Sequence, residues 1–215
     1  MNAAPGPEHF VAAAEFVLML RQSGLSDRRV LRAMEQVPRV PFLDPRFFHL
    51  ADEDIALPIA LGQTILKPTL AAAMLESLAV EPAHRVLQVG TGSGYTAAVL
   101  GRLAAAVVTI ERWRKLADEA HVRLRGLGYD MVETQFGDGL GGYPPRAPYD
   151  RILMTCAVED VPQALVAQLA PGGVLVAPLT SGEIVRLIRG TGGTTRAAAG
   201  QGQVDPAVPG VARRL

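Results

Sequence analysis

Several features that this sequence lacks narrow the classes of protein it can represent. Cys156 is the only cysteine among 215 residues, which excludes an internal disulfide and a cysteine-built zinc site, and fits a reducing compartment. Basic and acidic residues number 21 each, so no net field favours nucleic acid or an anionic membrane. Residues 10–20, the most apolar early stretch, contain Glu15 and follow no basic region, which argues against a signal peptide or membrane span. We therefore expect a cytoplasmic protein without nucleic-acid or membrane partners.

Aromatic residues are also few, at 5%, although 49% of the residues are hydrophobic and only 20% are charged. This composition is typical of a globular protein whose interior is filled by aliphatic and alanine side chains. The length favours one domain with extensions. No metal site is predicted, because the histidines have no spacing suited to metal ligation or to a catalytic triad; they are His9, His49, His84 and His121.

The pattern along the chain divides it into three parts. Residues 1–68 predict a helical N-terminal extension, with a helix over 10–20 and a second one capped by Ser26, followed by an irregular connection. Residues 69–190 show regular alternation of strand and helix patterns. Residues 191–215 are rich in glycine and alanine with almost no large apolar side chains, so we expect a weakly ordered tail without a closing strand.

The alternating part predicts an α/β fold of the Rossmann-like type. The expected strands are 85–89, 106–111, 131–136, 151–155, 174–177 and 184–188, and the expected helices are 70–78, 96–103, 112–127 and 161–169, the last with Asp160 as its cap. Such alternation gives a mostly parallel sheet with helices on both faces. Its ligand is expected at the carboxyl ends of the strands.

A glycine-rich turn follows the first of these strands. It consists of Gly90, Thr91, Gly92, Ser93 and Gly94, directly before a helix. Glycines permit backbone to approach a ligand closely, and the amides at a helix start can meet a carboxylate or phosphate. A glycine turn can also simply close a strand-to-helix connection. The spacing lacks the third glycine of a dinucleotide fingerprint, since Tyr95 stands there, and no nucleoside triphosphate loop is present.

Two acidic residues strengthen the interpretation of this turn as a ligand site. Glu111 ends the next strand, 21 positions after Gly90, where a carboxylate can accept hydrogen bonds from ribose hydroxyls. Asp138 lies in a Gly-Asp-Gly turn after the third strand and can accept from an adenine amino group. Each acid alone is equally well explained as a helix cap or a solvated turn residue. Together with the turn they favour an adenosyl ligand.

Longer segments point to a known family. They read RVLRAMEQVPRVPF, DEDIALPIALGQTILKP, RVLQVGTGSGYTAAVL, VVTIER, GDG, APYDRILMTCA and QALVAQLAPGGVLVAPL. Over about residues 28–188 the sequence resembles the protein-L-isoaspartate (D-aspartate) O-methyltransferases, which are class I S-adenosylmethionine-dependent methyltransferases. The combination of GQTI after Pro58 with GTGSGY is the most specific part of this resemblance.

The resemblance implies roles for particular residues. The methionine end of S-adenosylmethionine would lie on residues 90–94, the ribose on Glu111 beside Arg112, and the adenine on Asp138 and Gly139. A second group would close over the methyl donor and the substrate carboxylate, namely Gln63, Thr64, Ile65 and Leu66.

The reaction implied is methyl transfer to the free α-carboxyl of an isoaspartyl residue in a damaged protein, with S-adenosylhomocysteine as product. The ester then cyclises to a succinimide, which reopens partly to normal aspartate. A carboxylate is already ionised near neutral pH and the sulfonium is already activated, so the protein mainly has to align them.

The sequence departs from the family pattern in three places. These departures weaken the assignment of the isoaspartyl reaction to this sequence. Leu66 stands where the family usually has serine, Gln88 stands where it usually has an acid, and the tail lacks the expected apolar strand. Our hypothesis is that Thr64, as the candidate catalytic residue, or backbone amides take over the positioning of the substrate. The alternatives are a diverged methyltransferase acting on a small molecule or a dedicated peptide, and a protein that binds S-adenosylmethionine without catalysis.

Overall fold

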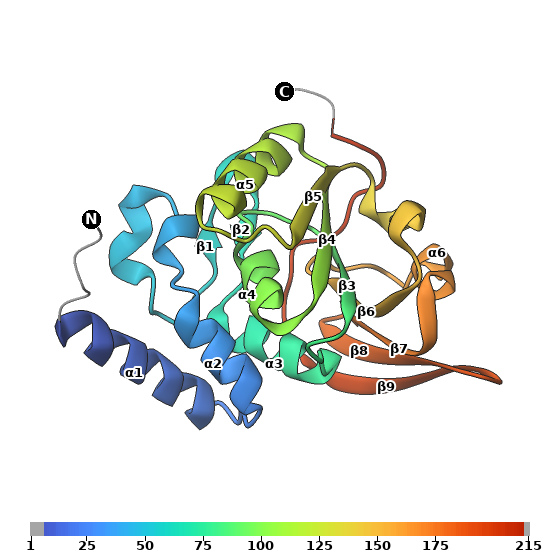
Figure 1. Ribbon diagram of the computed structural model, residues 1–215, viewed down its shortest axis with the longest axis horizontal. Coiled ribbons are helices and arrows are strands. Elements are labelled where there is room, and N and C mark those ends of the chain that lie inside the picture. Colours follow the sequence, from blue (N-terminus) through green and yellow to red (C-terminus); the bar gives the residue numbers. More distant parts are fainter. Residues whose placement is uncertain (1–6, 213–215) are drawn as a thin grey trace.

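The computed structural model (Figure 1) describes residues 7–212 and is built around a seven-stranded sheet. In spatial order its strands are β5 (Val132–Phe136), β4 (Ala106–Glu111), β3 (Arg85–Val89), β6 (Tyr149–Met154), β7 (Leu169–Pro178), β8 (Glu183–Gly190) and β9 (Gly193–Gln201). The pairs from β5 to β7 are parallel, and β8 and β9 are added antiparallel. The expected mostly parallel Rossmann-like sheet is confirmed.

The strand order reverses at β3, which pairs with β4 on one side and with β6 on the other. The connections that leave the carboxyl ends of these strands therefore diverge and open a crevice, which is where doubly wound folds bind ligands. The glycine turn follows β3 directly, so the sequence places it at this crevice.

The helices agree with the expected positions in most cases. They are α1 (Pro7–Gln22), α2 (Arg28–Gln36), α3 (Pro68–Leu78), α4 (Tyr95–Leu103), α5 (Arg114–Gly126) and α6 (Gln163–Ala167), with a small hairpin of β1 (Leu57–Pro58) and β2 (Thr64–Ile65) between α2 and α3. The cap of α2 is Asp27 rather than Ser26: its carboxylate accepts from the amides of Arg29 and Val30, whereas the Ser26 hydroxyl donates to Glu76.

Helix α6 is shorter than expected, and the strand after it starts earlier. Pro162 occupies the N-cap, and Asp160 accepts from the adjacent Val161 amide and from the Arg196 side chain instead of capping the helix. At its other end the chain enters β7 at Leu169, so that the Pro171-Gly172-Gly173 stretch expected to stop the helix lies within the strand. The register between β6 and β7 shifts beside this stretch, which accommodates the proline and glycines.

The prediction of a weakly ordered tail is wrong for residues 193–201, which form β9. This strand pairs with β8 from Gly190↔Gly193 to Glu183↔Gln201. Its residues are nearly all exposed, so it contributes backbone hydrogen bonds rather than apolar area. Such a strand has none of the apolar alternation by which a sequence predicts a strand.

The N-terminal extension shares the core of the alternating part. Leu20 of α1 and Met34 of α2 belong to the same buried cluster as Leu100 of α4 and Val174 of β7. In Figure 1, α1 and α2 lie along the side of the sheet occupied by α3 and α4. Helices α1 and α2 therefore share one core with the irregular connection, residues 42–67, and with the alternating part, and they do not form a separate unit. Among the described residues, no helix has both the length and the apolar character needed to cross a bilayer.

Candidate active site

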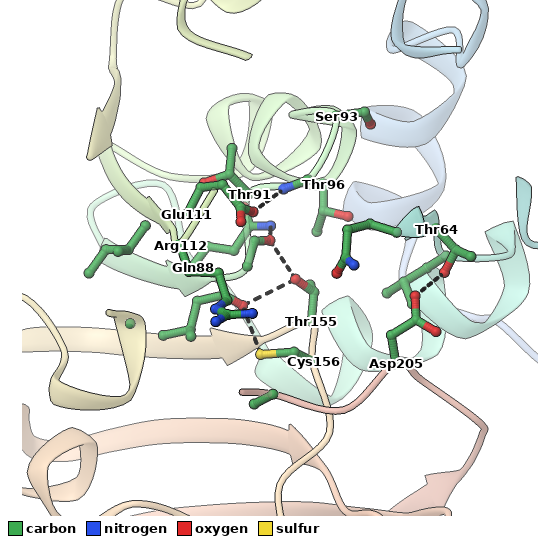
Figure 2. A pocket seen from close by; sticks show the side chains of 18 of the residues that line it. Thr64, Gln88, Thr91, Ser93, Thr96, Glu111, Arg112, Thr155, Cys156 and Asp205 are labelled. Atoms are coloured by element: carbon green, nitrogen blue, oxygen red, sulfur yellow. Dashed lines mark hydrogen bonds between the residues drawn. The ribbon is translucent and has the colours of Figure 1, made fainter. Parts of the chain in front are cut away.

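A cavity of about 290 Å³ opens at the carboxyl ends of β3, β4 and β6. Its walls come from seven separate stretches of chain, which are residues 62–66, 88–93, 95–96, 110–112, 138–140, 155–156 and 205–208. Figure 2 shows Glu111 and Arg112 on one side of this cavity and Thr64 with Asp205 on the other. All but one of the residues expected to bind cofactor or substrate line this single cavity, the exception being Gly94.

The glycine turn approaches its neighbours too closely for larger residues. A Cβ at Gly90, where φ is +93°, would lie 2.7 Å from the Thr155 hydroxyl oxygen. That hydroxyl donates to the carbonyl of Gly90 at 2.6 Å, and the hydroxyls of Thr91 and Thr109 are 2.8 Å apart. The turn is thereby fixed before any ligand binds. Gly94 instead caps α4 and packs against Leu124 of α5.

Glu111 is buried at the end of β4 and faces the glycine turn. One carboxylate oxygen accepts from the Gly92 amide at 2.9 Å, and the other accepts from the Trp113 amide at 3.0 Å. Each carboxylate oxygen has a second lone pair, so both can also accept from ribose hydroxyls. The carboxylate is thus held in one orientation by backbone on both sides.

Asp138 acts as a turn cap, one of the roles that the sequence left open, and it also lines the cavity. Its Oδ1 accepts from the Leu140 amide at 3.0 Å, as a turn cap does, and its Oδ2 accepts from the Gly210 amide at 2.7 Å. A Cβ on the adjacent Gly139 would lie 2.6 Å from a methyl of Val89, so only glycine fits there. Both residues line the cavity, and the missing side chain at Gly139 leaves room for an adenine ring.

The other end of the cavity is formed by the β1–β2 hairpin. Its tip includes Leu61, a non-glycine residue with φ of +62°, which is a strained conformation often found at functional sites. The Gln63 amide nitrogen donates to the Leu61 carbonyl at 3.2 Å, and the Thr64 hydroxyl donates to Asp205 at 2.7 Å. Ile65 and Leu66 are buried at the base of the hairpin and still reach the cavity wall.

Arg39 holds the connection that carries this hairpin. Only 1% of its surface is exposed, and its guanidinium donates to four carbonyls at 2.9 to 3.3 Å. The acceptors belong to Ala51, Glu53, Ile55 and Leu66. Burial lowers the pKa of this side chain, but an arginine remains charged at any physiological pH. One side chain therefore fixes the connection at points spread over 16 residues, from Ala51 to Leu66.

One unpaired buried atom, the side-chain oxygen of Gln88, fits the expected cofactor. The Gln88 amide nitrogen donates to the Gly90 carbonyl at 2.8 Å, but its oxygen has no partner among the described residues, and neither has the Tyr95 hydroxyl. Both residues line the cavity and are 1% exposed. An unpaired buried acceptor beside the turn matches the ammonium group of a methionine moiety. The acids at the other positions match ribose and adenine, so the residues present fit S-adenosylmethionine.

Cys156 lines the same cavity and is not suited to act as a nucleophile. Burial, together with the nearby Glu111 and Asp138, raises the pKa of its thiol to about 12. It therefore stays neutral at pH 8 and gains reactivity only as the pH approaches 12.

Alkylation of Cys156 should therefore be slow in the folded protein. A pKa near 12 leaves about one thiol in ten thousand ionised at pH 8, against roughly a quarter for an ordinary cysteine. We expect iodoacetamide at pH 8 to label the native chain at least about a hundredfold more slowly than the chain unfolded in urea. Mass spectrometry of timed samples measures both rates. Equal rates would show that folding does not keep the thiol neutral.

Sequence patterns missed one wall of the cavity, which the chain forms after β9. We call residues 203–212 the C-terminal strap. It is tied to the core by the amide of Ala157 donating to Asp205, the amide of Ala207 donating to Ala157, and the amide of Ala212 donating to Arg112, at 2.7 to 3.0 Å. Arg112 also donates to the Gly210 carbonyl at 3.1 Å. The only sign of a functional role in this segment of the sequence is one acid, Asp205, next to proline in a mostly apolar stretch.

Comparisons with known proteins agree with this geometry. Residues 12–194 match the family model described as protein-L-isoaspartate(D-aspartate) O-methyltransferase. The protein-L-isoaspartate O-methyltransferase of Xanthobacter autotrophicus is 50% identical over 204 residues, covering 93% of each chain. That of Azorhizobium caulinodans is 53% identical over 176 residues, covering 82% of this chain and 81% of the relative.

Solved structures support the same assignment. A protein-L-isoaspartate O-methyltransferase superimposes with a TM-score of 0.82 at 27% identity, covering 91% of this chain and 66% of the other. A putative member from Plasmodium falciparum, solved with S-adenosyl-L-homocysteine, has a TM-score of 0.78 over 90% of this chain and 97% of its own; at 19% identity it supports the fold alone. The chain therefore belongs to the protein-L-isoaspartate(D-aspartate) O-methyltransferase family, whose members are methyltransferases that use S-adenosylmethionine.

Proposed function

We propose that this chain transfers a methyl group from S-adenosylmethionine to the free α-carboxyl of L-isoaspartyl residues in damaged proteins. The observation that carries the proposal is one cavity with two chemically distinct ends. Glu111 and Asp138 offer acceptors for an adenosyl group at one end, and the β1–β2 hairpin meets Asp205 at the other.

The donor end has the functional groups that the cofactor requires. When bound, S-adenosylmethionine supplies a methyl group activated by its sulfonium. Residues 90–93 would bind the methionine end, with the free oxygen of Gln88 accepting from its ammonium. Glu111 would accept from the ribose hydroxyls with Arg112 beside it, and Asp138 with Gly139 would bind the adenine. Because each group is already held by backbone or tight packing, little rearrangement is needed on binding.

The acceptor end must supply hydrogen bonds to a carboxylate. The Thr64 hydroxyl has one hydrogen and donates it to Asp205, so Thr64 is better suited to shaping the site than to holding the acceptor. The Gln63 amide has a second hydrogen beyond the one it donates to Leu61. We therefore assign Gln63, with backbone amides of the hairpin, to hold the acceptor carboxylate, and Thr64 to position them. Ile65 and Leu66 exclude water from the adjoining wall.

The test is methyl transfer from labelled S-adenosylmethionine to two peptides that differ only in whether one residue is L-isoaspartate or normal aspartate. We expect label to enter the isoaspartyl peptide as a base-labile ester and the aspartyl peptide not at all. Cofactor binding without transfer to either peptide would instead favour a binding protein without catalysis.

Because Leu66 stands where the family usually has serine, restoring the serine gives a separate prediction for stability and activity. Leu66 is 8% exposed and packs in the main core, so Leu66→Ser should cost about 2–4 kcal/mol of stability, as other large-to-small core changes do. The new hydroxyl would add a donor at the acceptor end, and we expect kcat/KM for the isoaspartyl peptide to rise roughly threefold to tenfold, as one neutral hydrogen bond allows. Leu66→Ala is the matched control, because it loses the same packing without gaining a hydroxyl. Equal activities of the two variants would show that the missing hydroxyl does not limit the enzyme.

We also propose that the protein acts in the cytoplasm. The single cysteine is compatible with a reducing compartment.

A further inference from the structure

The C-terminal strap brings one carboxylate to the rim of the acceptor end. On the strap, the Asp205 carbonyl accepts from Ala157 at 2.8 Å, and the carbonyl of Ala157 accepts from Ala207 at 2.7 Å, so the backbone on both sides of Pro206 is fixed. The side chain of Asp205 points at Thr64 across the rim, as Figure 2 shows. The residue is partly exposed and so faces both the cavity and solvent.

No cation of the described residues balances this carboxylate. Among the residues whose side chains the structure describes, Asp205 takes part in no ion pair. Lys67, the lysine that follows the hairpin in sequence, lies 3.8 Å from Asp54 instead. Arg112, the one basic residue among the described residues that line the cavity, lies at the opposite side and is tied to Gly210. The acceptor end therefore carries an uncompensated negative charge.

The hydrogen-bonding groups at this rim favour the same kind of ligand as its negative charge does. Thr64 donates its only hydroxyl hydrogen to Oδ2 of Asp205, so the pair offers the cavity lone pairs alone. Lone pairs and a negative charge favour N–H groups and cations, and they oppose a second carboxylate.

We propose that Asp205 is a specificity-determining residue that selects isoaspartyl acceptors by the charge of the residue beside the target. It favours a basic neighbour and disfavours an acidic one. The target carboxylate would bind at Gln63, next to the positively charged methyl donor, whereas a flanking side chain would lie at the rim, where Asp205 is partly exposed. This inference rests on the proposed function, since it names a preference among acceptors of the same site.

The size of the preference follows from the exposure of the rim. Two unit charges several ångströms apart at a protein surface change an equilibrium by a few-fold, so attraction to lysine and repulsion of glutamate together amount to about tenfold. Salt screens charges at an exposed rim, so the preference should shrink to about twofold at 0.5 M salt.

The experiment uses three isoaspartyl peptides that differ only in the residue following isoaspartate, which is Lys, Gln or Glu. For the wild-type chain at low salt we expect kcat/KM to fall in that order, with about tenfold between Lys and Glu. Asp205→Asn keeps an oxygen that accepts from Thr64 and removes the charge, so the Lys-to-Glu ratio should drop below about twofold. Asp130→Asn is the matched control, because Asp130 is exposed and pairs with Arg125 away from the cavity; it should keep the wild-type ratio.

The outcomes separate this inference from the proposed function. A wild-type ratio near one at low salt, or a ratio that Asp205→Asn leaves unchanged, overturns the role of Asp205 while leaving the methyltransferase intact. Loss of the ratio in Asp130→Asn overturns it too, since net charge would then be the cause. Failure of the wild-type chain to methylate any of the three peptides overturns the proposed function and this inference with it. The salt dependence of the wild-type ratio tests the charge argument without any variant.

Discussion

Glu111→Ala is expected to weaken binding of S-adenosylmethionine by at least about a hundredfold. The carboxylate fixes the Gly92 amide at 2.9 Å and the Trp113 amide at 3.0 Å, so its loss frees the glycine turn as well as removing the acceptors for the ribose. Hydrogen bonds to a charged group contribute about 1.5–3 kcal/mol each, and two ribose hydroxyls therefore account for roughly 3–6 kcal/mol. That corresponds to a factor of about a hundred to about ten thousand or more in Kd.

Calorimetric titration of the variant with S-adenosylmethionine measures this effect. The control is Glu119→Ala, a carboxylate on the exposed face of α5 that lies 3.9 Å from Lys115 and outside the cavity. It should bind as the wild-type chain does. If Glu111→Ala bound within threefold of the wild-type chain while remaining folded by circular dichroism, the assignment of Glu111 to the ribose would be wrong.

Arg39→Met is expected to lower the free energy of unfolding by about 3–5 kcal/mol, because several buried carbonyls lose their hydrogen-bond donor. The variant keeps much of the apolar volume but leaves four carbonyls, at Ala51, Glu53, Ile55 and Leu66, without their donor. Burying an unpaired carbonyl costs about 1–3 kcal/mol, and partial access of water to the outer ones keeps the total below the sum. The hairpin that carries Thr64 should loosen at the same time.

The measurement is a urea titration followed by circular dichroism, with limited proteolysis between residues 51 and 66 as a local readout. Arg32→Met serves as the matched control, since Arg32 is exposed on the same α2 segment that precedes Arg39. It should change stability by less than about 0.5 kcal/mol, as surface substitutions usually do. A loss below 1 kcal/mol in Arg39→Met would mean that the connection is held by packing rather than by this side chain.

The positions of the residues expected at the donor end follow from local rules. A buried strand, a glycine turn and a helix place Gly90 at the carboxyl edge of the sheet. Parallel pairing then brings the ends of the next two strands, with Glu111 and Asp138, to that same edge. No long-range information beyond the handedness of the crossovers was needed.

The acceptor end could not be predicted in the same way. Its contacts join residues far apart in the chain: Thr64 meets Asp205 across 141 positions, and Asp138 meets Gly210 across 72. The strap has no periodic pattern, and β9 before it is exposed and rich in glycine and alanine, which is typical of disorder when considered alone. These segments are ordered by pairing with β8 and with the cavity wall, which only the folded chain supplies.

The acids at the donor end also show why a structural and a functional explanation need not compete. Asp138 caps its turn, holds the strap through Gly210 and faces the cavity. Glu111 holds the glycine turn in place, and both are expected to bind the same ligand. A residue fixed by backbone donors is already oriented for binding, so its structural contacts support its role in the site.

The central claim is that the cavity at the ends of β3, β4 and β6 is a single S-adenosylmethionine site. Calorimetric titration of the wild-type chain with S-adenosylhomocysteine tests it most directly, because this product needs no acceptor and undergoes no turnover. The account predicts one saturable site per chain, protected from exchange at the amides of Gly92 and Gly210. Absence of saturable heat, or binding that leaves both amides unprotected, would contradict it.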